Sequence, residues 1–329
     1  MANWVRNNSS FEAIPIIDIA PLVIPNDNSK SLQKTVNEIR DACKNVGFFY
    51  IKNHQIPKDH LNALIPLVQE FFNLPLEEKM KIHISKSDIF RGYTPLGKEL
   101  TDEKYDWHEC VDFGLDLEPS HPEVIEGKQL VGPNQWPENQ HNFRKVLEKH
   151  WDLMIILGRR ITEGLAISLG LSKKYFAPFM SKSHSYMRIS NYPPYKKNQE
   201  ENIGDGIGAH IDYGFLTILL QNNIGGLEIK NFNNEWIKAP IIPGTFLINI
   251  GHMIQRWTND YYKATIHRVI PPKNKTRCSL PFFFEPNFDT VVAPLDKFCS
   301  ADNLPRYKPI HFGDYLERTF KTSYTYAVE

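Results

Sequence analysis

Three residues of the chain could together hold a metal ion: His210, Asp212 and His267. Residues i and i+2 of a β-strand point to the same face, so His210 and Asp212 can aim at one point. Two histidines and one carboxylate with open coordination positions suit non-haem iron(II). Zinc sites with such ligands usually place two histidines four apart on a helix. His252 is an alternative to His267, which we prefer because its surroundings are β-prone.

A second pair of residues points to the binding of a carboxylate. Arg277 and Ser279 are two positions apart in a β-prone stretch, so their side chains share one face. An arginine can hold a carboxylate with two charge-assisted hydrogen bonds, and the hydroxyl adds one more donor. Because this pair follows His267 closely in the chain, we expect a small dicarboxylate to bind beside the metal.

The segments that must position these residues are typical of strands. Residues 215–220 (Phe-Leu-Thr-Ile-Leu-Leu) are apolar and β-prone, as in a buried strand. Gly225-Gly226 predicts a turn into residues 227–229, with the chain returning as in a hairpin. Residues 236–240 and 244–250 predict two further strands.

Helices are expected on either side of this strand-rich region. Residues 142–169 carry apolar side chains at a helical period and end at Gly170, so this long helix should pack against a sheet. Residues 29–45 show the same period on a shorter scale. Residues 85–114 have few periodic apolar positions and several turn formers, which predicts an irregular segment.

In these residues and in the motifs around them, the chain resembles the isopenicillin N synthase-like branch of the Fe(II)- and 2-oxoglutarate-dependent dioxygenases. The matching motifs extend in the family's order from about residue 14 to about residue 295. They include His210-Ile-Asp212-Tyr-Gly, Asn259-Asp-Tyr-Tyr-Lys-Ala-Thr-Ile-His267-Arg-Val, Arg277-Cys-Ser279-Leu-Pro-Phe-Phe, Ile14-Pro-Ile-Ile-Asp18 and Arg91-Gly-Tyr-Thr-Pro-Leu-Gly97.

The resemblance implies a mainly β fold with flanking α-helices. Its core would be a double-stranded β-helix, or jelly roll, formed from about residue 185 to 290 and braced by the long helix. Residues 1–329 would make one domain, with an amino-terminal α/β part over residues 1–120. Strand content alone would also allow another β-sandwich or barrel.

The resemblance also implies Fe(II), 2-oxoglutarate and O2, with no catalytic residue beyond the iron centre. Iron would be held by His210, Asp212 and His267, and 2-oxoglutarate by Arg277, Ser279 and Tyr192. Many family members carry an asparagine two residues before the tyrosine, where this chain has Ser190, while Asn191 lies between. Which of these two side chains supplements Tyr192 stays open at this stage.

The segment at the mouth of the family's active site supplies further candidates. Arg91, Tyr93 and His108, with Glu109 beside it, match positions there and are predicted to contact substrate, as is Phe283. The alternative is a structural role in a solvated loop for the first four residues, and a place in the apolar core for Phe283. The substrate itself is not specified by the sequence, since the family acts on peptides, amino acids, nucleobases and secondary metabolites.

The implied reaction is oxidation of a C–H bond of a small molecule, by hydroxylation or by oxidative cyclisation or desaturation, with release of succinate and CO2. One alternative is an oxidase of the same fold that uses no 2-oxoglutarate, as isopenicillin N synthase does. The other is a non-catalytic jelly-roll protein whose metal is structural.

The composition agrees with a small-molecule enzyme. The 329 residues have a formal net charge of zero, so we expect neither a nucleic-acid nor a membrane partner. The four cysteines show no paired spacing, which fits a reducing compartment. Residues 1–10 lack an apolar signal core. We therefore expect a soluble, cytoplasmic monomer.

Overall fold

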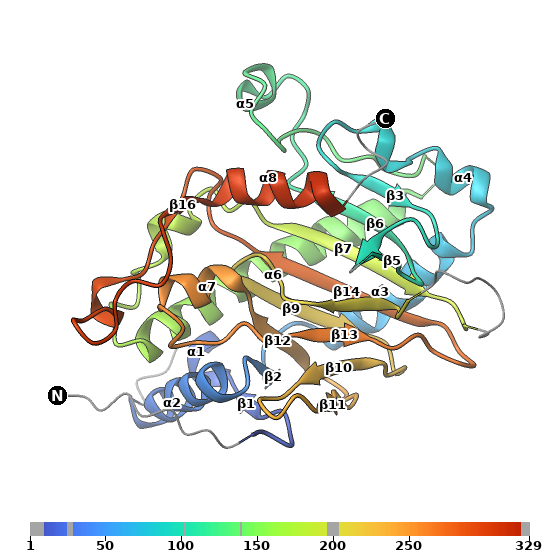
Figure 1. The fold of residues 1–329 in the computed structure, drawn as a ribbon. Coiled ribbons are helices and arrows are strands. Elements are labelled where there is room, and N and C mark those ends of the chain that lie inside the picture. The colour runs from blue at the N-terminus through green and yellow to red at the C-terminus, as the bar shows by residue number, and fades with distance from the viewer. Residues whose placement is uncertain (1–9, 25–28, 102, 139, 196–203, 324–329) are drawn as a thin grey trace.

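The computed structural model describes residues 10–24, 29–101, 103–138, 140–195 and 204–323. In this part of the chain the large sheet has eight strands (Figure 1). In spatial order they are β1 (Ile16–Asp18), β2 (Phe48–Lys52), β12 (Phe246–Ile250), β9 (Leu216–Gln221), β14 (Arg277–Phe284), β7 (Tyr186–Tyr192), β6 (Glu109–Gly114) and β3 (Gly92–Thr94).

A second, smaller sheet faces the centre of the large one. Its described strands, in order, are β11 (Trp236–Lys238), β10 (Leu227–Lys230), β13 (His267–Val269) and β8 (Ile207–His210). Two short antiparallel pairs lie outside both sheets: β4 (Leu100–Thr101) with β5 (Lys104–Tyr105), and β15 (Val291–Val292) with β16 (Ile310–His311). The two facing sheets form the expected jelly roll, which confirms that prediction.

The helices cover the other face of the large sheet and its ends. They are α1 (Ala20–Val23), α2 (Ser29–Asn45), α3 (Lys58–Phe72), α4 (Leu76–Met80), α5 (Pro122–Ile125), α6 (His141–Ser168), α7 (His252–Trp257) and α8 (Phe312–Ser323). Helices α6 and α3 contact β14 and lie behind the large sheet in Figure 1. Gly158 of α6 allows a close approach, because a Cβ there would lie 2.6 Å from the Phe284 ring. The long bracing helix is therefore confirmed.

Side chains along the central strands of the large sheet alternate between the apolar core under the helices and the cavity on the other face. In β14, Cys278, Leu280, Phe282 and Phe284 belong to the apolar core under the helices. The intervening Arg277, Ser279, Pro281 and Phe283 face the small sheet and line a cavity. Strand β7 repeats this pattern, with Met187 and Ile189 in the helical core. Each strand therefore buries apolar side chains on one face and places polar and aromatic side chains along the cavity on the other.

Two predictions about local structure are wrong. Gly225-Gly226 does not close a hairpin, because β9 belongs to the large sheet whereas β10 pairs with β11 and β13 in the small one. The glycines instead carry the chain between sheets, and Gly226 has a φ of 140°, which L side chains rarely adopt. Residues 85–114 are also more ordered than expected, since β6 is buried along its whole length and pairs with β7.

Candidate active site

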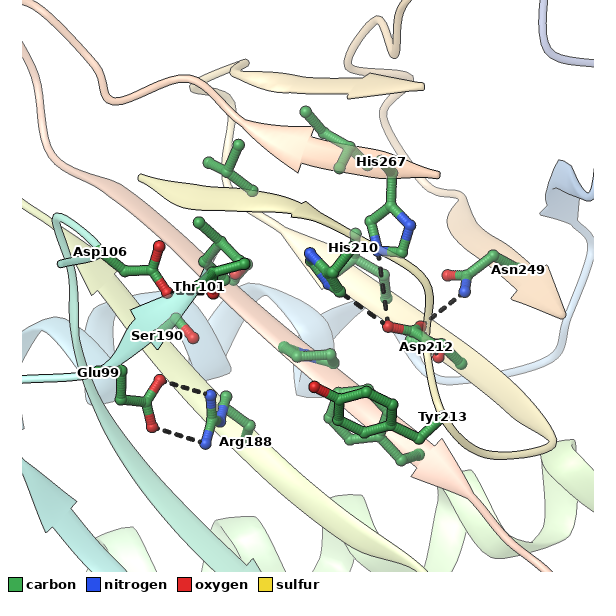
Figure 2. A pocket seen from close by; sticks show the side chains of 18 of the residues that line it. Glu99, Thr101, Asp106, Arg188, Ser190, His210, Asp212, Tyr213, Asn249 and His267 are labelled. Carbon is green, nitrogen blue, oxygen red and sulfur yellow. Dashed lines mark hydrogen bonds and ion pairs between the residues drawn. The ribbon is translucent and has the colours of Figure 1, made fainter. Parts of the chain in front are cut away.

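The cavity between the two sheets has a volume of about 260 Å³. Its walls come from both sheets, from the loop that contains Asp212 and Tyr213, and from the segment around β4 and β5 (Figure 2). Phe320 of α8 contributes from the carboxyl-terminal helix. Segments far apart in the sequence therefore meet at one pocket.

The three predicted metal ligands lie together in this pocket. Strand β8 ends at His210, and His267 begins β13 directly opposite it in the antiparallel register. Asp212 Oδ1 is 3.6 Å from His210 Nε2 and 3.5 Å from His267 Nε2. One donor atom from each residue falls within 4.8 Å of the others, a spacing that a single metal ion can bridge. The donor set fits iron(II) with open positions.

Backbone carbonyls orient both imidazoles. His210 Nδ1 donates to the carbonyl of Gly208 at 2.8 Å, and His267 Nδ1 donates to the carbonyl of Thr265 at 3.1 Å. With the proton held at Nδ1, each Nε2 presents its lone pair toward Asp212. Both rings are thus fixed in the form that binds a metal.

Asp212 is held from its other side. Asn249 Nδ2 donates to Asp212 Oδ2 at 2.6 Å, and the Thr217 hydroxyl donates to the same oxygen. Without a metal, burial of Asp212 opposes its charge, but the attraction of protonated His267 and His210 outweighs burial and holds the pKa of Asp212 well below its usual range; a bound metal ion would take the place of these protons. Asp212 is therefore an ionised carboxylate that offers Oδ1 to a metal.

The predicted carboxylate clamp lies in the same pocket. Arg277 and Ser279 pair in register with Tyr192 and Ser190 across β14 and β7, and all four line the cavity. Arg277 is 1% exposed, and its Nη1 donates to Ser279 Oγ at 3.2 Å. Among the described residues, its Nε has no hydrogen-bond partner. A buried guanidinium with a spare donor fits a dicarboxylate.

The two candidates beside Tyr192 separate onto opposite faces of β7. Asn191 points away from the pocket, and its Nδ2 donates to Glu109 Oε1 at 2.9 Å. Ser190 faces the pocket, where its buried hydroxyl has no hydrogen-bond partner among the residues that the structure describes. Ser190 is consequently the side chain that stands beside Ser279.

Among the predicted substrate contacts, the structure brings only Phe283 to this pocket. Arg91 instead donates to backbone carbonyls, including those of Leu115 and Gly132 at 2.9 and 2.5 Å. Its buried guanidinium holds a loop together, so the prediction of a substrate contact here is corrected for Arg91.

Tyr93 and His108 also lie behind the pocket walls. The Tyr93 hydroxyl donates to Glu109 Oε2 at 2.6 Å. His108 bonds Glu99 Oε2 through Nε2 at 2.9 Å and the Gly206 carbonyl through Nδ1 at 3.0 Å. Neither these two residues nor Glu109 is among the residues lining the cavity, so their polar atoms support its walls instead.

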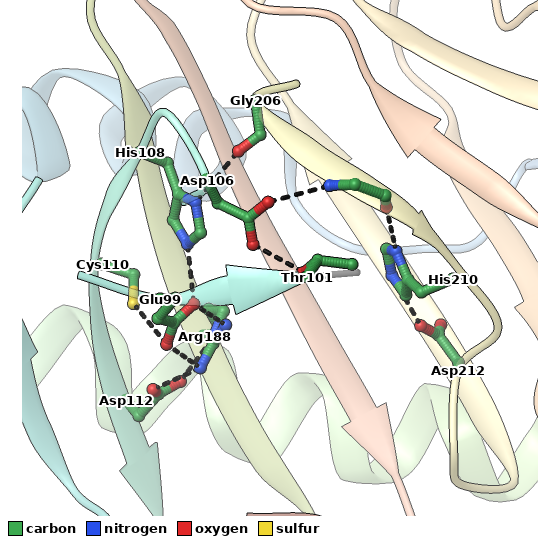
Figure 3. Close-up of polar contacts among 11 residues, drawn as sticks. Glu99, Thr101, Asp106, His108, Cys110, Asp112, Arg188, Gly206, His210 and Asp212 are labelled. Carbon is green, nitrogen blue, oxygen red and sulfur yellow. Dashed lines mark hydrogen bonds and ion pairs between the residues drawn. The ribbon is translucent and has the colours of Figure 1, made fainter. Parts of the chain in front are cut away.

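The resemblance placed this region at the mouth of the active site, but Glu99, Thr101 and Asp106 were not predicted; they lie in the cap segment, which we define as residues 99–101 and 103–108 around β4 and β5. Glu99 of this segment pairs with Arg188 of β7, with Nη1 and Nη2 at 2.8 and 2.9 Å from its two oxygens. Asp106 accepts from the Gly208 amide at 2.9 Å, so hydrogen bonds connect the cap segment through Gly208 to His210 (Figure 3). The alternation of Tyr186, Arg188, Ser190 and Tyr192 in β7 was the available signal for Arg188 and Ser190.

The alternative ligand His252 lies in α7, where its Nδ1 is 3.1 Å from the Tyr315 hydroxyl. It is absent from the ligand clusters found among the described residues. Glu99, His108 and Cys110 form a second cluster of ligand types. The Arg188 guanidinium already satisfies Glu99 there, and its positive charge would repel a metal ion.

A histidine–aspartate–histidine cluster inside a jelly roll, beside a buried arginine clamp, defines the class of non-haem iron oxygenases. The chain belongs to the 2-oxoglutarate- and Fe(II)-dependent oxygenase superfamily. Residues 14–139 match the family model described as the amino-terminal part of the non-haem dioxygenase in morphine synthesis, and residues 183–286 match that of the 2OG-Fe(II) oxygenase superfamily.

Individual relatives cover nearly the whole chain. Homoarginine-6-hydroxylase 2-ODD-233 of Oryza sativa subsp. japonica is 37% identical over 326 residues, covering 96% of this chain and 99% of the relative. The 2-oxoglutarate-Fe(II) type oxidoreductase hxnY of Emericella nidulans is 33% identical, covering 95% and 90%. The crystal structure of a full-length Neurospora crassa protein in complex with alpha-KG and 5-formyluracil has a TM-score of 0.80 at 28% identity, covering 94% and 96%.

The enzyme is thus an Fe(II)- and 2-oxoglutarate-dependent dioxygenase that oxidises a small organic molecule with O2. This confirms the activity implied by the resemblance, rather than the 2-oxoglutarate-independent oxidase or the non-catalytic metal protein. In the described part of the chain, no helix is both long and apolar enough to cross a membrane.

Proposed function

We propose that His210, Asp212 and His267 hold the catalytic iron, and that Arg277, Ser279 and Tyr192 bind 2-oxoglutarate beside it. The observation that carries this assignment is that all six residues face one cavity of about 260 Å³. Iron with 2-oxoglutarate supplies the oxidation of a C–H bond by O2, in which one oxygen atom enters the product and the other enters succinate.

The roles of the chain follow from its contacts. Asn249 and Thr217 engage Asp212 Oδ2, so that Oδ1 would be the oxygen left for the metal, while Gly208 and Thr265 fix the two imidazoles. Arg277 would hold the distal carboxylate, because its guanidinium is buried and already aligned by Ser279 and Gln221. The apolar walls, such as Leu219, Leu227 and Val269, keep water from the reacting atoms.

For the substrate, we propose a basic amino acid of the homoarginine type, hydroxylated on a side-chain carbon. The name of the rice relative supports this choice. A cavity of about 260 Å³ is near the lower end of ligand pockets, roughly 300–1,000 Å³, which favours a small molecule. The acidic side chains Glu99 and Asp106 lie in the pocket wall.

Succinate formation tests this function. Purified enzyme with Fe(II), 2-oxoglutarate and O2 is incubated with L-homoarginine, L-arginine, L-lysine or 5-formyluracil, and the products are analysed by mass. We expect succinate and an equal amount of a product heavier by one oxygen with L-homoarginine, and neither in His267→Ala. If 5-formyluracil alone gave succinate with an equal amount of oxygenated product, the proposed amino-acid substrate would be wrong and a nucleobase would take its place.

We further propose that residues 1–329 act as one catalytic domain. Support comes from the pocket, to which both family-matched segments contribute walls: Glu99 and Asp106 from the first, β7 to β14 from the second. We also propose a monomer in the cytoplasm, where the four free cysteines would stay reduced. Light scattering and cell fractionation test the last two points.

A further inference from the structure

Asp106 is a buried carboxylate on the wall of the active-site pocket. It is 2% exposed, and no lysine, arginine or histidine of the described chain forms an ion pair with it. Burying a charge without an opposite charge is costly, so such groups are normally paired. At a pocket wall, the missing partner is expected to arrive with a ligand.

The hydrogen bonds of Asp106 leave room for such a partner. One carboxylate oxygen accepts from the Gly208 amide at 2.9 Å, and the other accepts from the Thr101 hydroxyl at 2.6 Å. An ionised carboxylate has about four acceptor positions, so roughly two stay available. Burial raises the pKa of Asp106 more than the nearby His108 and the two hydrogen bonds lower it, which is the direction expected for a carboxylate without an ion pair.

The cationic side chains nearest Asp106 are already engaged by other carboxylates. Glu99 and Asp112 both pair with the guanidinium of Arg188, and Glu99 also bonds the His108 ring, so these four groups already pair with one another. Burial opposes ionisation of Glu99, but Arg188 and His108 outweigh it and lower its pKa to about 2. Asp106 is therefore the carboxylate on the cap side of the pocket that has no ion pair among the described residues.

The opposite side of the pocket is balanced by its own ligands. Asp212 and the two negative charges of 2-oxoglutarate would be offset by Fe(II) and by Arg277. The negative charge of Asp106 is then left for the substrate to neutralise.

An independent feature points to a ligand at the same place. Ser190 is 1% exposed and lines the pocket, yet its hydroxyl has no hydrogen-bond partner among the described residues. Figure 2 shows Ser190 near Asp106 and Glu99 at one end of the pocket, with the metal ligands at the other end. A buried hydroxyl and an unpaired carboxylate that line the same pocket suit a ligand with several N–H donors.

Aromatic side chains complete the surroundings. Tyr186 stacks on Phe283 with ring centroids 4.3 Å apart, and Phe320 meets Tyr186 edge-on at 5.6 Å. All three rings line the pocket, together with Tyr213. Aromatic faces attract guanidinium and ammonium groups, which adds a second preference for a cation.

We propose that Asp106 is the specificity-determining residue that anchors the cationic end of the substrate, with Ser190 accepting one of its N–H groups. This inference rests on the proposed function, because it assigns a residue to the recognition of a basic substrate at that site. A guanidinium is favoured over an ammonium, since its planar N–H groups match a carboxylate.

The test combines Asp106→Asn with a change in the substrate. The substitution removes the charge and keeps the shape. We measure succinate formation with L-homoarginine and with its neutral ureido analogue, L-homocitrulline. For L-homoarginine, Asp106→Asn should raise KM roughly 30-fold or more, as expected for a lost buried charge pair. For L-homocitrulline, KM should change by less than about 3-fold.

Two control variants distinguish a loss of substrate binding by Asp106 from a general disturbance of the cap segment. Glu103→Gln removes one charge from an exposed position of the same cap segment and should leave both KM values unchanged. Thr101→Val removes a hydrogen bond to Asp106 but keeps its charge, so the KM for L-homoarginine should rise far less than in Asp106→Asn. The iron-dependent binding of 2-oxoglutarate is measured in each variant, since Asp106 also bonds Gly208 beside His210.

The outcomes distinguish this inference from the proposed function. Turnover of L-homoarginine by the wild type, with an unchanged KM in Asp106→Asn, would overturn the role of Asp106 and keep the function. If Asp106→Asn does not fold, the wild type alone decides: it should prefer L-homoarginine over L-homocitrulline at least about 10-fold in KM. Equal KM values would contradict the inference. If the enzyme, with iron and 2-oxoglutarate, oxidised only neutral molecules, both the proposed basic substrate and the proposed role of Asp106 would be wrong.

Discussion

The guanidinium of Arg277 lies over the ring of Tyr192, with its central carbon 4.6 Å from the ring centroid. The two residues face each other in the register between β14 and β7. The ring supports one face of the guanidinium and leaves its donors in the plane toward the pocket. Tyr192 therefore positions the proposed carboxylate clamp through its ring.

This arrangement predicts different effects for two substitutions of Tyr192. Tyr192→Leu removes the aromatic face and should raise the KM for 2-oxoglutarate roughly 5- to 30-fold, as for the loss of about 1–2 kcal/mol. Tyr192→Phe keeps the face and should stay close to the wild type. Steady-state kinetics with varied 2-oxoglutarate measure both. An equal loss in both variants would show that the hydroxyl makes the decisive contact.

Arg277→Ala should weaken 2-oxoglutarate binding far more than iron binding. The buried carboxylate would lose a bidentate partner, which predicts a rise in KM of roughly 30-fold or more. Arg277→Lys should recover only part of this, because an ammonium cannot form the paired hydrogen bonds. Isothermal titration with Fe(II), and then with 2-oxoglutarate, separates the two affinities. Loss of iron binding in both variants would make Arg277 part of the metal site instead.

The amide of Asn249 should matter for iron affinity. Its Nδ2 donates to Asp212 Oδ2, so Asn249→Ala frees the carboxylate to rotate away from its metal-binding orientation. Removing such a supporting hydrogen bond typically costs about 10- to 100-fold in metal affinity. Asn287→Ala is the matched control: the amide of Asn287 also donates a hydrogen bond, but to the Pro178 carbonyl, and neither residue lines the cavity. Equal iron affinity in the two variants would contradict the role of Asn249.

A buried histidine pair outside the active site predicts how stability depends on pH. His150 is 0% exposed, and burial together with the charge of His60 lowers its pKa from 6.5 to about 3. Since the fold disfavours the protonated ring, this stability is complete above pH 6.5 and is lost as the pH falls toward 3.

His150→Leu should remove this dependence. At pH 5, the wild type should have lost roughly 2 kcal/mol of unfolding free energy through His150, and the variant should not. Urea unfolding at pH 7 and pH 5 gives the comparison. His141→Leu, at the exposed start of the same helix, is the control. A pH dependence that persists unchanged in His150→Leu would assign the acid sensitivity to other groups.

The sequence was informative where the residues of a site lie close together in one strand, or where a periodic pattern extends over one long helix. His210 with Asp212, and Arg277 with Ser279, are recognisable because side chains two apart share a face. The long helix was predicted to within one residue at each end, since its apolar positions follow a helical period over many turns. Phe283 follows the same alternation within β14, three pairs of residues beyond Arg277.

Predictions failed where pairing between distant segments decided the structure. Gly225-Gly226 resembles a hairpin turn locally, but β10 pairs with β11 and with β13 rather than with the preceding β9. Asp106 and Glu99 lie in a segment without periodicity, and only tertiary contacts with Gly208 and Arg188 bring them to the pocket. Arg91 and Tyr93 have the residue types of substrate contacts, yet nearby carbonyls and Glu109 already satisfy them.

The central claim is that 2-oxoglutarate binds to an iron held by His210, Asp212 and His267. Anaerobic titration of the metal-free enzyme with Fe(II) and then 2-oxoglutarate, followed by visible absorption, tests it most directly. We predict a charge-transfer band that requires both additions, is abolished in His267→Ala and Asp212→Ala, and persists in His252→Ala. A band that survives in His267→Ala but disappears in His252→Ala would contradict the ligand assignment.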